Sequence, residues 1–548
     1  MRQYRSGATV RALGVALAGA AALVLAGPSS ASEVAPAKTA GIRTVEVDLA
    51  KAGRPLDRSF NLAVGSDFSG TLIRPDSLAQ LKTAVDELGF RYLRFHAIFH
   101  DALGTVRQVD GKTVYDWTKI DQLYDAMLHM GIKPFVELGF TPQAMATSPQ
   151  TIFYWKGNTS HPQMDRWAGL IAAFVRHLEQ RYGRREIRTW YFEVWNEPNL
   201  AGFWQDADQA AYFHLYDVTA RTIKRIDPKL RVGGPATAGA AWVPTFIAHV
   251  AQVRAPLDFI TTHTYGVDGG FLDQDGKADT KLSPSPDAIV GDVRRVRAQI
   301  QASPRPGLPL YITEWSTSYT PRDAVHDSYV SAAYILAKLK ASEGLAQGMS
   351  YWTFSDLFEE PGPPTAPFQG GFGLMTPEGI RKPAYFAYKY LNALGQTELK
   401  TTDTQSLVTW DDGVLKALVW DFVTPRQDKT DRDFYTKVLP ARSAPPVSLD
   451  LKHLRPGTYR VEIHRTGFDA NDAYTAYLLM GSPVSLSPEQ LRKLQDATRD
   501  IPEVRQLTIG STGAATLRIP IRTNDVVLVV VKKPSLQPRS SAEVPGVL

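Results

Sequence analysis

The chain has 548 residues, of which 44% are hydrophobic and 21% are charged, so it can bury a large core and is not globally disordered. Its formal net charge of +5 is small for this length, and its Lys and Arg residues are interspersed with acids, which excludes the basic patch typical of nucleic-acid binding. It contains no cysteine, which excludes disulfides, thiol catalysis and cysteine-ligated metal sites. The length predicts two or three domains.

Residues 1–31 have the features of a cleavable secretion signal. Three arginines in the first eleven positions form a basic start, an apolar stretch at residues 12–26 follows, and small residues then offer a cleavage site after Ala31. The alternative is a membrane anchor, but the apolar stretch is shorter than the roughly 20 residues that a membrane span requires. We therefore expect a periplasmic or extracellular protein with a linker at residues 32–42 and no membrane contact after cleavage.

From about residue 60 onward, short apolar segments alternate with longer segments whose apolar residues recur at helical spacing. The expected strands lie at residues 61–64, 92–95, 134–138, 191–197, 230–233, 258–260, 311–314 and 349–354. The helices expected to follow them lie at residues 76–88, 117–130, 167–182, 210–226, 243–253, 288–300, 329–345 and 384–394. Eight such repeats predict an α/β fold, a closed (β/α)8 TIM barrel over residues 59–396. A doubly wound open sheet also alternates in this way, but no glycine-rich phosphate loop follows the first strand.

The pattern changes after this barrel, where short strand-like segments replace the helices. They lie at residues 415–422, 459–464, 515–519 and 526–531. They predict a C-terminal all-β sandwich accessory domain over residues 397–532. Residues 44–49 alternate at period two, so we expect the segment 43–58 to join the β domain as an N-terminal strand. The tail at residues 533–548 contains Pro, Ser and Gly and is expected to be disordered.

Two glutamates end two of the expected strands. Glu197 closes the run Tyr-Phe-Glu-Val-Trp-Asn-Glu at residues 191–197, and Glu314 closes the run Tyr-Ile-Thr-Glu at residues 311–314. Because the carboxyl ends of barrel strands meet at one face, we expect both side chains at the mouth of the barrel. Two carboxylates that face each other across a cleft are the groups that cleave a glycosidic bond. Alone, Glu197 is also consistent with a helix cap or an ion pair, but its pairing with Glu314 argues against that interpretation.

Short motifs recur in order along the chain. Trp-Asn-Glu-Pro at residues 195–198 and Glu-Trp at residues 314–315 resemble the large clan of retaining (β/α)8 glycosidases. Narrower motifs are Arg-Phe-His at 94–96, Thr-His-Thr-Tyr at 262–265, Tyr-Trp-Thr-Phe-Ser-Asp at 351–356, Phe-Gln-Gly-Gly-Phe-Gly-Leu at 368–374, Ile-Arg-Lys-Pro-Ala at 380–384, Asn-Asp-Ala-Tyr at 471–474 and Met-Gly-Ser-Pro at 480–483. Together they resemble glycoside hydrolase family 39, the β-xylosidase and α-L-iduronidase family, over residues 42–530.

The resemblance implies a role for individual residues. It implies double displacement with retention of configuration, in which Glu197 is the acid and base and Glu314 is the nucleophile. The residues that it places around the sugar are His96, Asn196, His263, Tyr265, Trp352 and Glu360, with Phe140 and Trp204 as walls of the cleft. We expect Tyr265 to donate a hydrogen bond to Glu314, and Arg94 to pair with a buried carboxylate. His96 and His263 are also consistent with satisfied core histidines. We expect no metal and no organic cofactor, because the histidines are not at metal-ligand spacing.

The residues after the eighth expected strand favour a neutral sugar. No Lys, Arg or His occurs between Asp356 and Arg381, although a uronate-binding site needs a cation. Iduronidases of the family carry an Arg where this chain has Pro367. Glu359 and Glu360 would repel a uronate and suit neutral hydroxyls. The resemblance therefore implies an exo-acting β-xylosidase with an oligosaccharide substrate.

Several alternatives stay open at this stage. The chain is also consistent with a relative that acts on arabinan-type or other neutral sugars, with an endo-acting exopolysaccharide hydrolase, and with transglycosylation. A carbohydrate-binding protein without turnover is a further alternative. The loop at residues 266–285 is rich in Gly and Asp and departs from a plain β-xylosidase, which indicates a different leaving-group side. The sequence predicts no particular oligomeric state.

Overall fold

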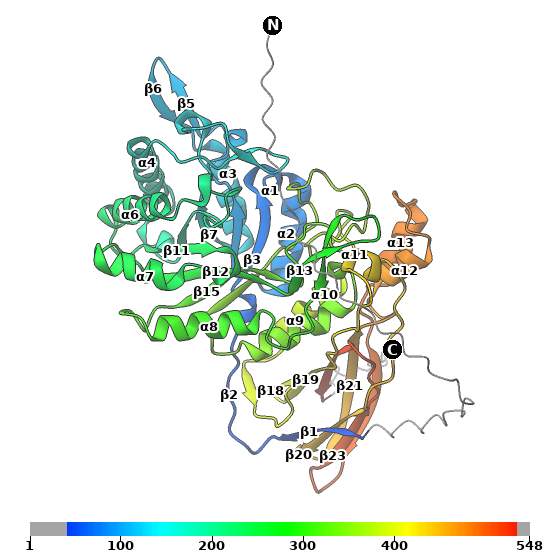
Figure 1. Ribbon diagram of the computed structural model, residues 1–548. Helices are drawn as coiled ribbons and strands as arrows, with labels where there is room; N and C mark the ends of the chain where they lie inside the picture. Colours follow the sequence, from blue (N-terminus) through cyan, green and yellow to red (C-terminus); the bar gives the residue numbers. More distant parts are fainter. Residues whose placement is uncertain (1–40, 534–548) are drawn as a thin grey trace, which may run out of the picture. The chain divides into compact units, whose positions relative to one another are not determined.

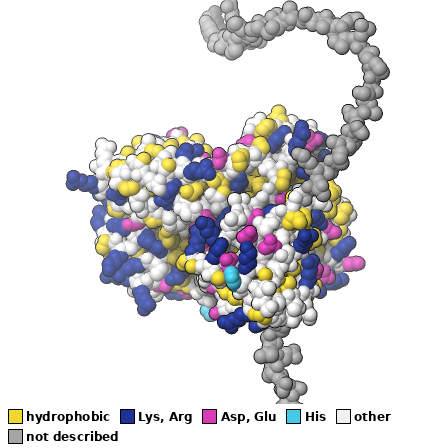
Figure 2. Space-filling model, turned by 90° about the horizontal axis from the view of Figure 1, so that it is seen from below, with side chains coloured by type: hydrophobic (Ala, Val, Ile, Leu, Met, Phe, Trp, Pro, Cys, Tyr) yellow, Lys and Arg dark blue, Asp and Glu magenta, His cyan; other side chains and the backbone are white. Residues whose placement is uncertain are grey.

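The computed structural model of the protein describes residues 41–533 (Figure 1). The predicted signal at residues 1–31, most of the predicted linker at residues 32–42 and nearly all of the predicted tail at residues 533–548 lie outside the described residues. Within the described part, no helix combines the length and the apolar content needed to cross a bilayer. On the face shown in Figure 2, Lys and Arg side chains are spread out with Asp and Glu among them.

Eight parallel strands close into a barrel (Figure 1). In chain order they are β3 (Ala63–Phe68), β4 (Tyr92–His96), β7 (Lys133–Leu138), β10 (Tyr191–Val194), β11 (Arg231–Thr237), β12 (Phe259–Tyr265), β15 (Leu310–Ser316) and β16 (Gly348–Tyr351). The ring closes where Tyr351 of β16 pairs with Val64 of β3. These strands are buried on both faces, so their sequences do not alternate apolar and polar residues as a strand with one solvent-facing side would. The predicted TIM barrel is confirmed.

A long helix follows each barrel strand along the chain. These helices are α2 (Pro75–Leu88), α3 (Thr118–Met130), α4 (Met164–Tyr182), α6 (Gln209–Ile226), α7 (Val243–Gln252), α8 (Val290–Gln301), α9 (Val330–Ala341) and α10 (Pro383–Ala393). In α2 the local sequence sets both ends. Pro75 supplies a helical φ at the first position, and Gly89 ends the helix in the left-handed region at φ 70°. Two short helices, α1 (Ser69–Leu72) and α5 (Arg184–Ile187), lie in the connections.

The two ends of the barrel differ in chemistry. At the amino end, Phe135, Tyr191, Phe259 and Tyr311 pack with Leu62 into an apolar plug. The hydroxyls of Tyr191 and Tyr311 lie 3.0 Å apart inside it. The carboxyl end instead gathers charged and polar side chains, as barrel enzymes do at their active sites.

Two further sheets pack face to face around one apolar core. The seven-stranded sheet has the order β2-β17-β18-β19-β24-β21-β22, and the three-stranded sheet has the order β1-β20-β23. Their bounds are β1 (Arg43–Asp48), β2 (Arg54–Pro55), β17 (Thr397–Leu399), β18 (Ser406–Asp411), β19 (Val414–Trp420), β20 (Val447–Lys452), β21 (Gly457–Thr466), β22 (Glu503–Ile509), β23 (Ala515–Ile519) and β24 (Val526–Lys532). The N-terminal strand β1 runs parallel to β20, so the chain enters this sandwich before it builds the barrel.

Several elements were not predicted from the sequence. Three hairpins interrupt the barrel: β5 (Val106–Val109) with β6 (Lys112–Tyr115), β8 (Thr151–Ile152) with β9 (Gly157–Asn158), and β13 (Val267–Leu272) with β14 (Ala278–Leu282). Three helices accompany the sandwich strands: α11 (Asp431–Tyr435), α12 (Ala473–Leu479) and α13 (Pro488–Asp496). The start of α13 could have been predicted, because Ser487 just before the helix and Gln490 in its first turn form a capping box. The accessory region is therefore not purely β.

The hairpin β13–β14 occupies the loop that the sequence marked as unusual. It docks on α11, where the backbone N–H of Leu282 donates to Asp431 at 3.0 Å and Arg432 pairs with Asp273. Of the residues in this loop, Val267 lines the cavity described next. The main contacts of the loop therefore connect the barrel to α11, and the loop contributes little to the cavity.

Candidate active site

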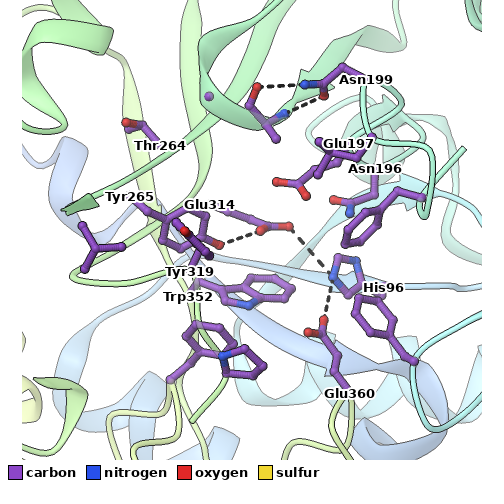
Figure 3. Close-up of a pocket in the computed structure, with 18 of the residues that line it drawn as sticks. His96, Asn196, Glu197, Asn199, Thr264, Tyr265, Glu314, Tyr319, Trp352 and Glu360 are labelled. Atoms are coloured by element: carbon purple, nitrogen blue, oxygen red, sulfur yellow. Dashed lines mark hydrogen bonds and ion pairs between the residues drawn. The ribbon is translucent and has the colours of Figure 1, made fainter. Parts of the chain in front are cut away.

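A cavity of about 610 Å³ opens at the carboxyl end of the barrel (Figure 3). Its walls come from the ends of β4, β12, β15 and β16 and from the segments that follow the strands. The predicted site residues that line it are His96, Asn196, Glu197, Tyr265, Glu314, Trp352 and Glu360. Residues that are far apart in the chain therefore meet in one space because the barrel brings their strand ends together.

Glu197 and Glu314 face each other in this cavity (Figure 3). An oxygen of one carboxyl lies within 4.8 Å of an oxygen of the other. Glu314 belongs to β15, whereas Glu197 lies just beyond β10 with φ of 45°. The left-handed region is unfavourable for a residue with a Cβ atom. The backbone N–H of Glu197 donates to the carbonyl of Ala236 at 2.8 Å, so the neighbouring strand β11 holds this conformation.

Arg94 organises the charges beside the two glutamates. Its fully buried guanidinium donates to Glu314 Oε1 and to Glu193 Oε2 at 2.6 Å each, and to Asn196 Oδ1 at 2.7 Å. A 3.1 Å ion pair joins it to Glu137. Burial opposes the charge of Arg94, but these carboxylates outweigh burial and raise the pKa of Arg94 above its ordinary value. The prediction that Arg94 pairs with a buried carboxylate is confirmed.

His96 connects a buried acid to an acid of the cavity. Its Nδ1 lies 2.7 Å from Glu137 Oε2, and its Nε2 lies 3.3 Å from Glu360 Oε1. Burial opposes a charge on the ring, but Glu137 outweighs burial, and the pKa of His96 lies well above its ordinary value. Burial raises the pKa of Glu360 to about 8, against the effect of His96. Glu137 of β7 thus keeps the imidazolium in place.

Burial raises the pKa of Glu197 to about 7, although the charges of His96 and Arg94 oppose the rise. A carboxyl group with this pKa keeps its proton for part of the time near neutral pH. That is the condition for donating the proton to a leaving oxygen.

His263 lies behind the two carboxylates rather than in the cavity. Its Nδ1 lies 2.8 Å from Glu197 Oε1 and 3.5 Å from Glu314 Oε2. The ring is fully buried, and burial lowers the pKa of His263 to about 4, so the ring is neutral at neutral pH. An ionised carboxylate can only accept a hydrogen bond, so Nδ1 donates to Glu197 when Glu197 is ionised. The predicted contact of His263 with a sugar is therefore corrected to a contact with the carboxylates.

Tyr265 and Trp352 complete the inner end of the cavity. The hydroxyl of Tyr265 donates to Glu314 Oε2 at 2.8 Å, as predicted from the sequence. Trp352 lies with its ring centroid 4.7 Å from that of His96. A Cβ atom on Gly65 of β3 would lie 2.2 Å from this indole, so the glycine makes room for it. Trp352 thereby offers a flat apolar surface beside the carboxylates.

Phe140 and Trp204 do not line the cavity, and the prediction that they wall it is wrong. Phe140 is buried and stacks on His96 with centroids 6.1 Å apart. Trp204 is fully buried, packs edge-on against Trp195 at 4.8 Å, and donates from its indole N–H to the carbonyl of Asp208. Both support the residues that carry the site and form part of the core.

Several other residues that line the cavity were not predicted from the sequence. The larger ones are Phe153, Asn199, Leu200, Phe203, Asp292, Tyr319 and Phe372. Leu200 and Phe203 follow closely after Glu197 in the chain, and this proximity could have indicated that they line the cavity. Phe153 and Tyr319 lie in connecting loops, where no periodicity reveals which side chains point inward.

Within residues 41–533, one cluster brings three possible metal ligands together, namely Glu197, His263 and Glu314. Glu314 already binds the guanidinium of Arg94 at 2.6 Å through one oxygen and the hydroxyl of Tyr265 through the other. The nearby cation opposes a second positive charge at this position. We therefore assign no metal to the cluster.

The geometry can be compared with known proteins. The sequence model of Glycosyl hydrolases family 39 matches residues 43–514. A β-xylosidase of Geobacillus stearothermophilus is 37% identical over 487 residues, which cover 87% of this chain and 93% of that protein. The crystal structure of a monomeric β-xylosidase from Caulobacter crescentus has a TM-score of 0.88 and 64% identity, and covers 90% of this chain and 99% of its own. The family 39 enzyme of Xanthomonas axonopodis pv. citri has a TM-score of 0.89 and 62% identity, and covers 90% of this chain and 98% of its own.

Proposed function

The chain belongs to glycosyl hydrolase family 39, and on this premise we propose that it is an exo-acting β-xylosidase that cleaves with retention of configuration. It is a glycosyl hydrolase with an oligosaccharide substrate, as the family and its relatives show. The observation that carries the finer proposal is that one carboxyl oxygen of Glu197 lies within 4.8 Å of one carboxyl oxygen of Glu314 in the cavity. Retaining enzymes hold their two carboxyl groups about 5 to 5.5 Å apart, and inverting enzymes about 6.5 to 9.5 Å apart.

Glu314 acts as the nucleophile in this proposal. Arg94 and Tyr265 each donate to a different oxygen of its carboxylate, at 2.6 and 2.8 Å. These donors orient the group and stabilise its negative charge before it reacts. When Glu314 attacks the anomeric carbon, the bond to the leaving oxygen breaks and a covalent glycosyl-enzyme forms.

Glu197 acts as the acid and then as the base. It transfers its proton to the leaving oxygen as the first bond breaks, so the aglycone departs as a neutral alcohol. A water molecule then attacks the same carbon and gives a proton to Glu197, while the bond to Glu314 breaks. The pKa of about 7 supports both tasks, because it lets the group hold a proton in one step and accept one in the next.

The charges in the cavity support a neutral sugar. Among the described residues, those that line the cavity include no Lys and no Arg, and the imidazolium of His96 is already engaged by Glu137 and Glu360. Arg94 is fully buried and already paired with Glu193 and Glu314, so it offers no free charge to a uronate. Glu359, which the sequence placed with Glu360, instead pairs with Arg74 at 2.6 Å. The relatives named as β-xylosidases favour xylose among neutral sugars.

The test is a side-by-side assay of aryl β-xyloside, α-L-arabinoside, β-glucoside and β-glucuronide at equal concentration. We expect the highest kcat/KM for the xyloside and no turnover of the uronide. Turnover of the uronide alone would overturn the proposal.

We also propose that the mature protein is exported and loses its first 31 residues. The support is the basic start and apolar stretch at the N-terminus. N-terminal sequencing of the protein from the periplasm or culture medium should begin near Ser32. An intact Met1 on cell-associated protein would contradict export.

A further inference from the structure

The cavity has two zones that differ in chemistry. The inner zone is polar: His96, Asn196 and Glu314 are buried there and Glu360 is half-buried, beside the indole of Trp352. The outer zone, here called the rim, contains the cavity-lining side chains Phe153, Leu200, Phe203, Val267, Tyr319 and Pro321. All of these rim side chains are apolar or aromatic. The leaving group of a glycoside must pass through the rim, because the sugar fills the inner zone.

One wall of the rim stands directly beside Glu197. The backbone N–H of Leu200 donates to the carbonyl of Glu197 at 3.0 Å, so the turn holds Leu200 close to Glu197. Phe153 and Phe203 pack edge-on with ring centroids 5.3 Å apart. Leu200 is 40% exposed, so its side chain has apolar surface free for a ligand. An aglycone protonated by Glu197 would therefore leave against an apolar wall.

Another part of the rim carries an exposed aromatic ring. Tyr319 is 51% exposed, and its ring meets that of Tyr265 edge-on at 6.3 Å. Pro321 follows it in the same loop and also lines the cavity. An aromatic ring of this exposure is an available stacking surface.

Two polar side chains that line the cavity outside the inner zone, those of Asn199 and Asp292, are already engaged. The amide of Asn199 donates to the carbonyl of Ala238 at 3.1 Å and accepts from its N–H at 2.9 Å. The carboxylate of Asp292 accepts from the hydroxyl of Thr264 at 2.6 Å and pairs with Arg295 at 2.7 Å. A second sugar needs several hydrogen-bonding partners for its hydroxyls. These side chains offer it fewer than the inner zone does.

We propose that the rim is a subsite for an apolar leaving group. Xylosides of aryl alcohols and of longer alkyl alcohols should therefore bind more tightly than the methyl xyloside. The proposal rests on the proposed function, because it assumes that xylose occupies the inner zone. Burial of apolar surface supplies the affinity, and one fully buried methylene raises it by roughly fourfold.

Inhibition by alkyl 1-thio-β-D-xylosides tests the subsite, because the sulfur linkage resists cleavage and isolates binding from chemistry. We expect the inhibition constant to fall by about twofold to fourfold for each methylene from methyl to pentyl. A series in which the inhibition constant does not change with chain length would overturn the proposal.

Substitutions at the rim locate the effect. Leu200→Ser and Tyr319→Ser should each raise the inhibition constant of the pentyl compound about threefold to tenfold and leave that of the methyl compound nearly unchanged. The matched control is Leu479→Ser in α12, where Leu479 is 71% exposed and does not line the cavity. It should change neither constant. An unchanged chain-length dependence in both rim variants would overturn the assignment.

Xylobiose cleavage keeps this proposal separate from the proposed function. If the unmodified enzyme cleaves xylobiose but binds all the thioxylosides equally, only the rim subsite is wrong. If it cleaves no xyloside at all, the proposed function fails and the subsite fails with it.

Discussion

Glu197 and Asp431 are both buried acids, and burial raises the pKa of Glu197 to about 7 and that of Asp431 to about 9. They differ in what surrounds them. Glu197 lines a cavity of about 610 Å³ and faces a second carboxylate, Glu314. Asp431 is fully covered and lies beside Asp323, since the hydroxyl of Thr280 is 3.0 Å from Asp323 and 3.4 Å from Asp431. We call Asp323 and Asp431 the carboxyl clasp.

The difference shows that a raised pKa reports burial and does not by itself mark a catalytic acid. In the carboxyl clasp, Asp431 also accepts from Gln427 at 2.6 Å and from the backbone of Leu282 at 3.0 Å, so its contacts join α11 to β14. In the cavity, Glu197 keeps one flank open to a substrate. Access to the reacting atoms separates the two acids, so substitutions that remove the acids should affect activity at one site and stability at the other.

The largest expected effect is on Glu314. Glu314→Gln removes the nucleophile and should lower kcat/KM for an aryl β-xyloside by about 10⁴-fold to 10⁶-fold. Glu314→Ala should regain part of its activity with azide and form the α-xylosyl azide. Asp431→Asn in the carboxyl clasp should lower kcat/KM less than about threefold. Equal losses in the two sites would refute the distinction between them.

The next effect is on Glu197 and depends on the leaving group. Glu197→Gln should lower kcat/KM for xylobiose about 10²-fold to 10⁴-fold, because the sugar oxygen needs a proton as it departs. The loss in the first step should be far smaller for 2,4-dinitrophenyl β-xyloside, whose phenolate leaves without one. Steady-state kinetics on both substrates check this, and an equal loss on both would argue against an acid at this position.

The pH dependence of kcat/KM should also reflect the ionisation of Glu197. Because Glu197 must hold its proton to act as the acid, ionisation above its pKa of about 7 should lower kcat/KM about tenfold per pH unit. The alkaline fall should disappear in Glu197→Gln. Glu360→Gln is the matched control, since it removes a cavity acid whose pKa burial raises to about 8 and should leave the fall near pH 7 in place. Persistence of that fall in Glu197→Gln would assign it to another group.

The last prediction concerns the carboxyl clasp, where the effect on activity is smallest and the change appears in stability instead. Burial raises the pKa of Asp431 from its ordinary 3.8 to about 9, so the folded state binds this proton more tightly than the unfolded state does. Its stabilising contribution is therefore complete below about pH 4 and is lost as the pH rises towards 9.

As the pH is raised from about 5 to 9, the Asp431→Asn variant should lose less stability than the unmodified protein does. Thermal unfolding at several pH values measures this. Asp433→Asn is the control, because Asp433 lies on the same helix and accepts from the backbone of Gln274. If Asp433→Asn flattens the dependence equally, the proton does not reside in the clasp.

The sequence predicted the elements that local periodicity encodes. The barrel strands and their helices lie close to the predicted ranges, and Glu197 and Glu314 were found because each ends an apolar run. Arg94 was found because a charge in a buried strand needs a partner.

Features that depend on packing between distant segments were not predictable in this way. The contact of Thr280 with Asp431 joins residues 151 positions apart and leaves no trace in local spacing. Trp204 and Phe140 were misplaced because the family resemblance that assigned them to the cleft does not tell which buried side chains border the cavity. His263 was placed on the right strand, but whether its ring meets the sugar or the carboxylates is decided by the neighbouring strands.

The most direct test of the account is covalent trapping with 2,4-dinitrophenyl 2-deoxy-2-fluoro-β-xyloside, followed by peptide mapping. The fluorine slows release of the glycosyl-enzyme, so the account predicts one fluoroxylosyl group on the peptide that contains Glu314, attached at that residue. Attachment to Glu197 or Glu360, or turnover of xylosides with inverted product and no trapped ester, would contradict it.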